Sequence, residues 1–287
     1  MKPGALAYFK PTTVTEAIGL LVDGGMDAKV IAGGQSLVPM LNLRMVAAER
    51  LVDVGGIAEM KQWSADDREV WIGACVTHDQ IQIGEVADPS NGLMPKVASK
   101  IAYQAVRNRG TIGGSLSLAD PAADWLTTTA ALGATIEWEG PDGKKSCPAE
   151  EFVFAAYTTQ LDISDVLTGV RIPRLPPDAT WGTYKLCRKA GEFAHAMAMV
   201  ISAGARSRAF LGATDGAPIR LMQTETLVAD FRNWESGHAA LVSQALEADI
   251  TESGRDFTDI QLWQSRTCLL RSIQMSLGFE PVRPEGV

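Results

Sequence analysis

The spacing of apolar residues predicts a mixture of short strands and helices in the first part of the chain. Apolar positions within residues 17–21 follow helical spacing, and residues 13–16, Thr-Val-Thr-Glu, have the form of a capping box. This helix is expected to end at the glycine pair 24–25. Short apolar runs bounded by glycine and polar residues predict strands. The strands expected on this basis span residues 29–32, 51–54, 69–73, 134–138 and 166–172.

Helical segments are expected between several of these strands. Residues 37–44 suit a short helix, with Pro39 in its first turn. A second capping box at residues 77–80 predicts another short helix, and residues 93–106 are predicted to be helical. Asp120 and Pro121 resemble an N-cap followed by a first-turn proline, so a helix is expected from there to about residue 132. Residues 140–143 predict a turn, and residues 109–115 a glycine-rich loop.

The pattern changes after residues 173–178, which contain three prolines and suit a linker. Beyond them, residues 181–188, 196–205 and 209–213 predict three strands joined by hairpins. Two helices are expected at residues 237–247 and 258–277. The chain is therefore predicted to be an α+β protein with domains at residues 1–176 and 177–287, the first with an internal division near residue 57.

Composition excludes several classes of function. The chain has 287 residues, 46% of them apolar, and a formal net charge of -8. A nucleic acid or an anionic membrane would on average be repelled, and no basic stripe offsets this, so no nucleic-acid partner is expected. The N-terminus lacks the apolar core of a secretion signal, and the most apolar stretch, residues 194–205, is too short to span a bilayer. We expect a soluble, cytoplasmic protein without membrane insertion.

Cysteine and histidine positions predict neither a metal site nor a catalytic residue. Cys75, Cys147, Cys187 and Cys268 are widely separated, so they cannot form a zinc ribbon or an iron–sulfur site locally. The three histidines are isolated, and no Ser-His-Asp pattern is visible.

Two similar glycine-containing segments are the most informative feature. The first glycine motif is residues 32–36, Ala-Gly-Gly-Gln-Ser, and the second glycine motif is residues 111–115, Thr-Ile-Gly-Gly-Ser. Glycine allows a close backbone approach and positive φ, which can direct successive N–H groups at an anion. Neither motif fits the Rossmann or Walker A pattern, and one alone would most often be a plain turn. Two of them, each near a strand or a helix, favour a joint site around one pyrophosphate.

The residues around both motifs resemble the FAD-binding medium subunits of molybdenum hydroxylases. Residues 31–44, Ile-Ala-Gly-Gly-Gln-Ser-Leu-Val-Pro-Met-Leu-Asn-Leu-Arg, and 111–125, Thr-Ile-Gly-Gly-Ser-Leu-Ser-Leu-Ala-Asp-Pro-Ala-Ala-Asp-Trp, are similar to this family. It includes the FAD subunits or domains of carbon monoxide, xanthine and nicotine dehydrogenases. The resemblance spans nearly the whole chain. It implies a vanillyl-alcohol-oxidase (PCMH)-type FAD-binding domain followed by a small C-terminal domain of antiparallel sheet and helices.

The resemblance also implies which residues contact FAD. Asp124 would accept a hydrogen bond from a cofactor hydroxyl, Lys185 would approach the flavin, and Phe193 would cover one face of the isoalloxazine. Each has an alternative: helix-dipole complementation for Asp124, a solvated charge for Lys185, and core packing for Phe193, as for the apolar positions 101 and 167. The implied contacts are Ala32, Gly33, Gly34, Gln35, Ser36, Leu37, Ile101, Thr111, Ile112, Gly113, Gly114, Ser115, Asp124, Leu167, Lys185 and Phe193.

The family also requires redox centres that this chain cannot hold. Each [2Fe–2S] cluster takes four cysteine ligands, whereas the chain has four scattered cysteines in all. The resemblance therefore implies a large molybdopterin subunit and a small [2Fe–2S] subunit, assembled with this chain as a dimer of heterotrimers. The expected role is electron transfer from the [2Fe–2S] subunit through FAD to an external acceptor. The alternatives are a stand-alone FAD-dependent oxidase or dehydrogenase and a nucleotide-binding scaffold without flavin. The sequence identifies neither substrate nor acceptor.

Overall fold

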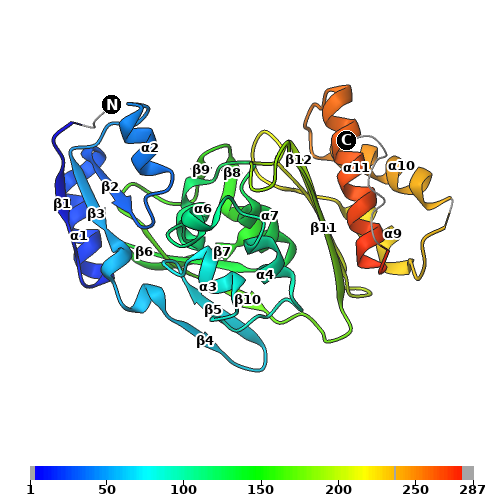
Figure 1. Ribbon diagram of the computed structural model, residues 1–287, viewed down its shortest axis with the longest axis horizontal. Helices are drawn as coiled ribbons and strands as arrows, with labels where there is room; N and C mark the ends of the chain where they lie inside the picture. The colour runs from blue at the N-terminus through cyan, green and yellow to red at the C-terminus, as the bar shows by residue number, and fades with distance from the viewer. Residues whose placement is uncertain (1–3, 236, 280–287) are drawn as a thin grey trace.

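The N-terminal part is a small parallel sheet covered by helices. The computed structural model describes residues 4–235 and 237–279. Strands β1 (Ala7–Phe9), β3 (Arg50–Asp53) and β2 (Ala28–Ile31) pair in that order, both pairs parallel (Figure 1). Helix α1 (Val14–Gly24) buries its apolar face against the sheet, and α2 (Leu37–Asn42) connects β2 to β3. The carboxyl ends of all three parallel strands therefore meet at one edge of this sheet.

The middle of the chain forms a five-stranded antiparallel sheet. Its order is β4 (Trp63–Ala65), β5 (Glu69–Gly73), β10 (Val166–Pro173), β6 (Thr135–Gly140) and β7 (Gly143–Pro148). A two-stranded sheet, β8 (Val153–Ala155) and β9 (Thr158–Thr159), lies beside it. The accompanying helices are α3 (His78–Gln82), α4 (Leu93–Ala98), α5 (Gln104–Arg107), α6 (Ile112–Leu118), α7 (Asp124–Ala131) and α8 (Ala149–Phe152).

The last part is a four-stranded antiparallel sheet with helices on its outer face (Figure 1). Its strands are β11 (Thr180–Leu186), β12 (Ala196–Ser202), β13 (Arg208–Gly212) and β14 (Ile219–Arg220), followed by α9 (Met222–Asp230), α10 (His238–Glu252) and α11 (Asp259–Ser276). Alternate residues of β12 face opposite sides. Met199 and Ile201 join the core of the preceding sheets, whereas Ala198 and Val200 pack with the C-terminal helices. The sheet therefore contributes to two cores. Helices and predominantly antiparallel sheets confirm the α+β class.

Some predicted elements were wrong in their bounds. The helix expected over residues 93–106 is interrupted between α4 and α5, where Ala102 has a φ of 43°. The helix expected at Asp120 begins only at Asp124, because the Asp120 carboxylate accepts the Ala122 N–H within a turn. Thr13 caps α1 as predicted, but the Glu16 carboxylate accepts from the Thr12 N–H, which leaves the reciprocal box incomplete. The capping box at the start of α3 is confirmed.

Several elements were missed altogether. They are β1, β4, β7, β8, β9, β14, α8 and α9. Within the described part of the chain, no helix is both long and apolar enough to cross a membrane.

Candidate functional site

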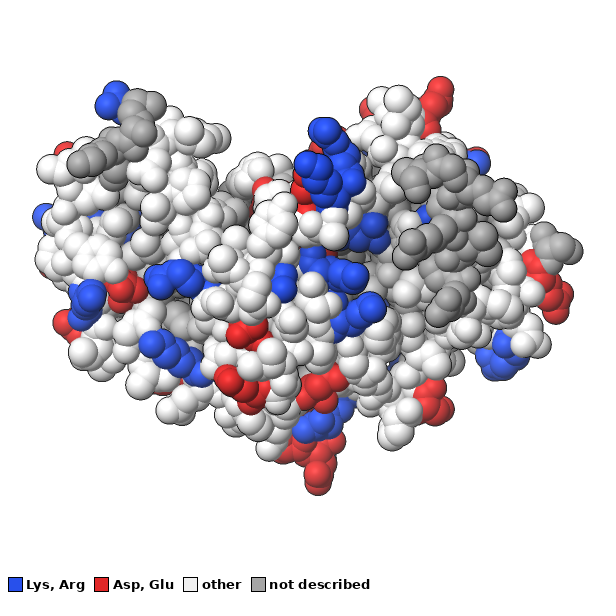
Figure 2. Space-filling view, viewed as in Figure 1, with Lys and Arg blue, Asp and Glu red and all other residues white. Residues whose placement is uncertain are grey.

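A cavity of about 660 Å³ lies at the carboxyl ends of the three parallel strands. Segments after β1, β2 and β3 form most of its wall, and Arg109, which precedes the second glycine motif, completes it. In Figure 2 the outline of the molecule is indented between the end that carries α2 and the middle that carries α6. The cavity is lined by Tyr8, Lys10, Ile31, Ala32, Gly33, Gly34, Gln35, Val38, Pro39, Asp53, Gly55, Gly56 and Arg109.

The first glycine motif presents backbone donors beside this cavity. It follows β2 directly, and Gly34 has a φ of 71°, in the left-handed region that glycine adopts without strain. The backbone N–H groups of residues 33–36 have no hydrogen-bond acceptor among the described residues. Ala32, Gly33, Gly34 and Gln35 line the cavity, while Ser36 and Leu37 begin α2 and Leu37 packs in a small core. The first motif therefore has the free donors that an anion requires.

The second glycine motif was predicted as a loop, and this was wrong. Thr111 is the N-cap of α6, and its hydroxyl accepts the Gly114 N–H at 3.1 Å. The N–H of Ile112 donates to the Val76 carbonyl, and that of Gly113 to the Ala74 carbonyl. Ser115 donates to the Thr111 carbonyl within the first helical turn. The backbone N–H groups of residues 112–115 are thus used inside the protein.

Close packing explains why glycines occur at the second motif. A Cβ on Gly113 would overlap the Ala74 side chain and lie 2.7 Å from its carbonyl oxygen. Gly110, just before the motif, lies against the buried His78 imidazole, whose Nδ1 accepts the Trp125 indole N–H at 3.0 Å. Burial lowers the pKa of His78 to about 4, so this histidine is a neutral packing residue at neutral pH.

The first motif is in direct contact with residues 109 and 110, which immediately precede the second motif. A Cβ on Gly33 would overlap the carbonyl oxygen of Arg109 and lie 3.0 Å from the Cα of Gly110. Only glycine at position 33 permits this approach. The structure therefore places the two motifs near each other, as the sequence predicted. The backbone N–H groups of the first motif are free, whereas those of residues 112–115 are bonded within the protein.

Asp124 and Lys185, both predicted cofactor contacts, bind each other. The Lys185 ammonium donates to both carboxylate oxygens of Asp124, at 3.1 and 2.9 Å. The Lys185 side chain is 14% exposed and the Asp124 side chain 12% exposed. Burial raises the pKa of Asp124, and the neighbouring Lys185 partly offsets this. Asp124 is the first residue of α7 and Lys185 lies on β11, so the pair joins the middle part of the chain to the last sheet.

The three apolar positions predicted near the flavin lie in different surroundings. Leu167 is 5% exposed within the main core, and Ile101 packs against that core. Phe193 is 60% exposed on the segment between β11 and β12. Gly191 on the same segment contacts the Ala102 carbonyl, so the structure places the loops that carry Phe193 and Ile101 side by side. Their contacts with a cofactor stay predictions.

Four polar or charged cavity residues were not singled out from the sequence: Tyr8, Lys10, Asp53 and Arg109. Tyr8 is on a strand that the apolar pattern did not show. Asp53 was within a predicted strand, and an acidic residue at the end of the strand that follows a glycine motif was an available signal.

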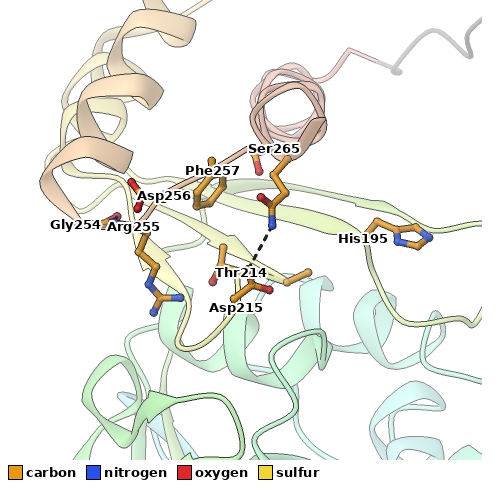
Figure 3. Close-up of a pocket in the computed structure, with 11 residues that line it drawn as sticks. His195, Thr214, Asp215, Gly254, Arg255, Asp256, Phe257 and Ser265 are labelled. Carbon is orange, nitrogen blue, oxygen red and sulfur yellow. Dashed lines mark hydrogen bonds between the residues drawn. The ribbon is translucent and has the colours of Figure 1, made fainter. Parts of the chain in front are cut away.

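A second cavity, of about 350 Å³, lies among the C-terminal elements and contains none of the predicted site residues (Figure 3). It is bordered by Arg255, Asp256 and Asp215, and Asp215 accepts the Gln261 amide N–H at 3.3 Å. Over the described ranges, no group of three or more His, Cys, Asp or Glu residues is arranged to hold a metal ion. Burial raises the pKa of Cys75 and Cys268 to about 12, which makes them unreactive thiols.

The residues at the first cavity fit a dinucleotide such as FAD. Free N–H groups of the first glycine motif suit a pyrophosphate, and Lys10 and Arg109 add positive charge on the same wall. The close approach at Gly33 keeps the second motif beside this position.

Comparison with known proteins agrees with this arrangement. The family described as FAD binding domain in molybdopterin dehydrogenase matches residues 4–175. The chain is 31% identical over 259 residues to the carbon monoxide dehydrogenase medium chain of Hydrogenophaga pseudoflava, which covers 89% of this chain and 86% of that one. It is 30% identical to the caffeine dehydrogenase subunit beta of a Pseudomonas species, with 91% and 87% covered.

Solved structures show the same fold over nearly the whole chain. Carbon monoxide dehydrogenase from Hydrogenophaga pseudoflava matches with a TM-score of 0.88 and 29% identity, covering 97% of this chain and 99% of that one. Quinoline 2-oxidoreductase from Pseudomonas putida 86 matches with a TM-score of 0.82 and 31% identity, with the same coverage. The predicted fold class is therefore confirmed, and the chain belongs to the family of FAD-binding domains of molybdopterin dehydrogenases.

Proposed function

We propose that this chain is the FAD-carrying subunit of a molybdenum hydroxylase, and that it passes electrons from a [2Fe–2S] subunit to an external acceptor. The observation that carries the proposal is the first glycine motif, whose unpaired backbone donors lie beside a cavity and next to the segment that precedes the second motif. Relatives that match over most of their length are named as medium chains or subunits of such dehydrogenases, which supports the same role here.

The residues of this chain bind and position the cofactor. FAD, when bound, supplies the redox chemistry. Residues 33–36 would donate backbone hydrogen bonds to its phosphates, and Arg109, just before the second motif, would add positive charge from the cavity wall. Asp124 and Lys185 form a buried polar pair between α7 and β11; the family resemblance places Asp124 at a cofactor hydroxyl and Lys185 near the flavin. Because FAD supplies the redox chemistry, the proposed electron transfer requires no catalytic cysteine or histidine in this chain.

The wider assembly follows from the same proposal. The molybdopterin and [2Fe–2S] centres reside on a large and a small partner subunit, because two [2Fe–2S] clusters need more ligands than the four cysteines present. We propose a dimer of heterotrimers in the cytoplasm. We also propose that residues 1–176 form the FAD-binding domain and residues 177–287 a C-terminal domain, although the β11–β14 sheet contributes side chains to both cores.

Co-purification with the partner chains tests this function. We expect the complex to show flavin absorbance, and its flavin to be bleached by the organic substrate only when the molybdopterin and iron–sulfur subunits are present. The chain purified alone with FAD should show flavin bands that the same substrates leave unchanged. Bleaching by an organic substrate in the isolated chain would indicate a stand-alone flavoenzyme. Absence of flavin bands from both preparations would indicate a scaffold that does not use flavin.

A further inference from the structure

Two stretches of this acidic chain carry positive charge and no acidic residue. Residues 89–119 contain four Lys or Arg residues and residues 179–191 contain three, and neither stretch has an Asp or Glu. The chain as a whole has a formal net charge of -8. A block of one charge sign within a chain of the opposite sign creates a local field that differs from the field of the whole molecule.

The fold brings these two stretches side by side. At one end, the Trp181 indole N–H donates to the Asn91 carbonyl at 2.9 Å. At the other end, a Cβ on Gly191 would lie 2.6 Å from the carbonyl oxygen of Ala102. The edge strand β11 and the residues after it run between these two contacts. Figure 2 shows Lys and Arg gathered where the middle of the molecule meets β11 and β12. The two stretches therefore contribute to one face.

Four cations on this face are exposed and have no acidic partner. We call Lys96, Lys100, Arg188 and Lys189 the basic surface. Lys96 lies on α4 with Lys100 just after it, and the other two lie on the loop between β11 and β12. None of the four is within ion-pair distance of a carboxylate among the described residues. Their charges are therefore available to a partner.

The basic surface lies beside the expected flavin end and carries exposed aromatic rings. Tyr103, which is 66% exposed, follows Lys100 closely, and the exposed Phe193 is on the loop of Arg188 and Lys189. Exposed aromatic residues together with Arg are typical of protein contact surfaces. Permanent subunit interfaces are more apolar, and interface cores are depleted in lysine, whereas charge guides transient encounters. The composition therefore favours a transient acidic partner over a permanent subunit.

We propose that the basic surface docks an acidic electron-carrier protein, and that this carrier is the external acceptor. The inference rests on the proposed function, because the electrons come from reduced FAD. One FADH2 gives one electron to each of two carrier molecules with a one-electron centre, which regenerates FAD and releases two protons to the solvent. Opposite charges accelerate the encounter and orient the carrier toward the flavin end, whereas a basic carrier is repelled at this position.

Binding to the co-purified complex tests the docking surface. The probe is cytochrome c in two forms: the native basic protein and the succinylated protein, which is acidic because its lysines carry carboxylates. The probe is ferrous and the flavin oxidised, so calorimetry measures binding without electron transfer. The surface variants are Lys96→Gln/Lys100→Gln and Arg188→Gln/Lys189→Gln. The control is Lys61→Gln/Arg68→Gln, which removes two exposed positive charges on either side of β4.

The two surface variants should lose affinity for the acidic probe only. At low ionic strength, each should bind succinylated cytochrome c roughly tenfold more weakly than the wild type. The difference should disappear at about 0.5 M salt, because exposed charges are then screened. The control should bind like the wild type, and native cytochrome c should bind no variant more weakly than the wild type. Bleaching of the flavin by the organic substrate should be unchanged in all of them.

The outcomes separate this inference from the function on which it rests. The inference is wrong if the wild type binds both forms of cytochrome c equally or does not bind the acidic form. It is also wrong if either surface variant binds the acidic form like the wild type. Loss of the partner subunits from the surface variants would show a permanent subunit interface instead. If the organic substrate does not bleach the flavin of the wild-type complex, the proposed function fails, while probe binding still decides the docking surface.

Discussion

The two glycine motifs both contain a Gly-Gly pair and end in serine, but the hydrogen bonding of their backbone N–H groups is opposite. In the first, the backbone N–H groups of residues 33–36 have no hydrogen-bond acceptor within the described part of the chain. In the second, the N–H groups of residues 112–115 are all bonded within the protein, and Gly113 is packed against Ala74. In the first motif, glycine leaves backbone N–H groups available to a ligand. In the second, glycine permits close packing between two segments of the chain.

This difference extends to the side chains around each motif. Near the first, Lys10 and Arg109 have no acidic partner within the described ranges, and Asp53 retains acceptor capacity. Near the second, His78 is paired with Trp125, and Asp124 with Lys185. The polar groups around the first motif are therefore available to bind a ligand. Those around the second motif are paired with each other and stabilise the fold. Substitutions at the cavity should accordingly affect ligand affinity, and substitutions of the buried residues around the second motif should affect the free energy of unfolding.

Lys185→Met should have the largest effect on stability. It leaves the Asp124 carboxylate buried without its cation, which is expected to reduce the free energy of unfolding by about 3 kcal/mol. Denaturant titration at pH 7 measures this loss. A loss below about 0.5 kcal/mol would show that the pair is not structural and would weaken the contrast between the two regions.

The pH dependence of this variant provides its control. Burial raises the pKa of Asp124 from the ordinary 3.8, and removal of Lys185 should raise it further. A raised pKa means that the folded state binds the proton more tightly, so stability falls as pH rises above the unfolded value. The deficit of Lys185→Met should therefore be smaller at pH 4 than at pH 7. The double variant Asp124→Asn/Lys185→Met should lack this dependence; equal deficits of the single variant at both pH values would contradict the explanation.

Gly113→Ala should reduce the free energy of unfolding by about 2 kcal/mol, because the added methyl group overlaps Ala74 in the core. The matched control is Gly19→Ala in the interior of α1, where nothing lies within 4 Å of the new methyl group. That control should be neutral or stabilising by about 0.5–1 kcal/mol. Chemical unfolding of both variants measures the difference. If Gly113→Ala instead folds like the wild type and loses only FAD affinity, the second motif is a ligand loop after all.

The sequence showed the two glycine motifs, but it did not show that their backbone N–H groups differ in hydrogen bonding. The apolar pattern located α1, α2, β2, β3 and the first three strands of the last sheet, because each carries a regular apolar pattern. It missed short edge elements such as β1, whose pairing depends on a distant strand. Whether an N–H group at a glycine motif is free depends on Val76 and Ala74, which are far away in sequence from the second motif. The pairing of Asp124 with Lys185 likewise depends on the docking of β11 near α7.

Gly34→Ala tests the first motif. Its φ of 71° should cost an alanine about 1 kcal/mol of stability, and the distorted loop should bind FAD at least about tenfold more weakly. Gly84→Ala is the matched control, because Gly84 has a similar φ of 77°, open space around its Cβ position and no place in the cavity. It should lose comparable stability and keep FAD affinity. Equal affinity losses in both variants, measured by flavin fluorescence titration, would show a general folding effect.

Gly114→Ala should have the smallest effect on stability. It tests directly whether the second motif contacts the cofactor. Gly114 is exposed in the first turn of α6, and a methyl group there meets only the Thr111 hydroxyl, at 2.9 Å. Alanine favours helix, so the free energy of unfolding should change by less than about 1 kcal/mol. FAD affinity should still fall, by roughly three- to tenfold, if this exposed surface faces the pyrophosphate. Ser117→Ala, one turn later on the exposed surface of α6, should leave affinity unchanged. Wild-type FAD affinity in Gly114→Ala would show that the second motif supports the site without contacting the cofactor at this residue.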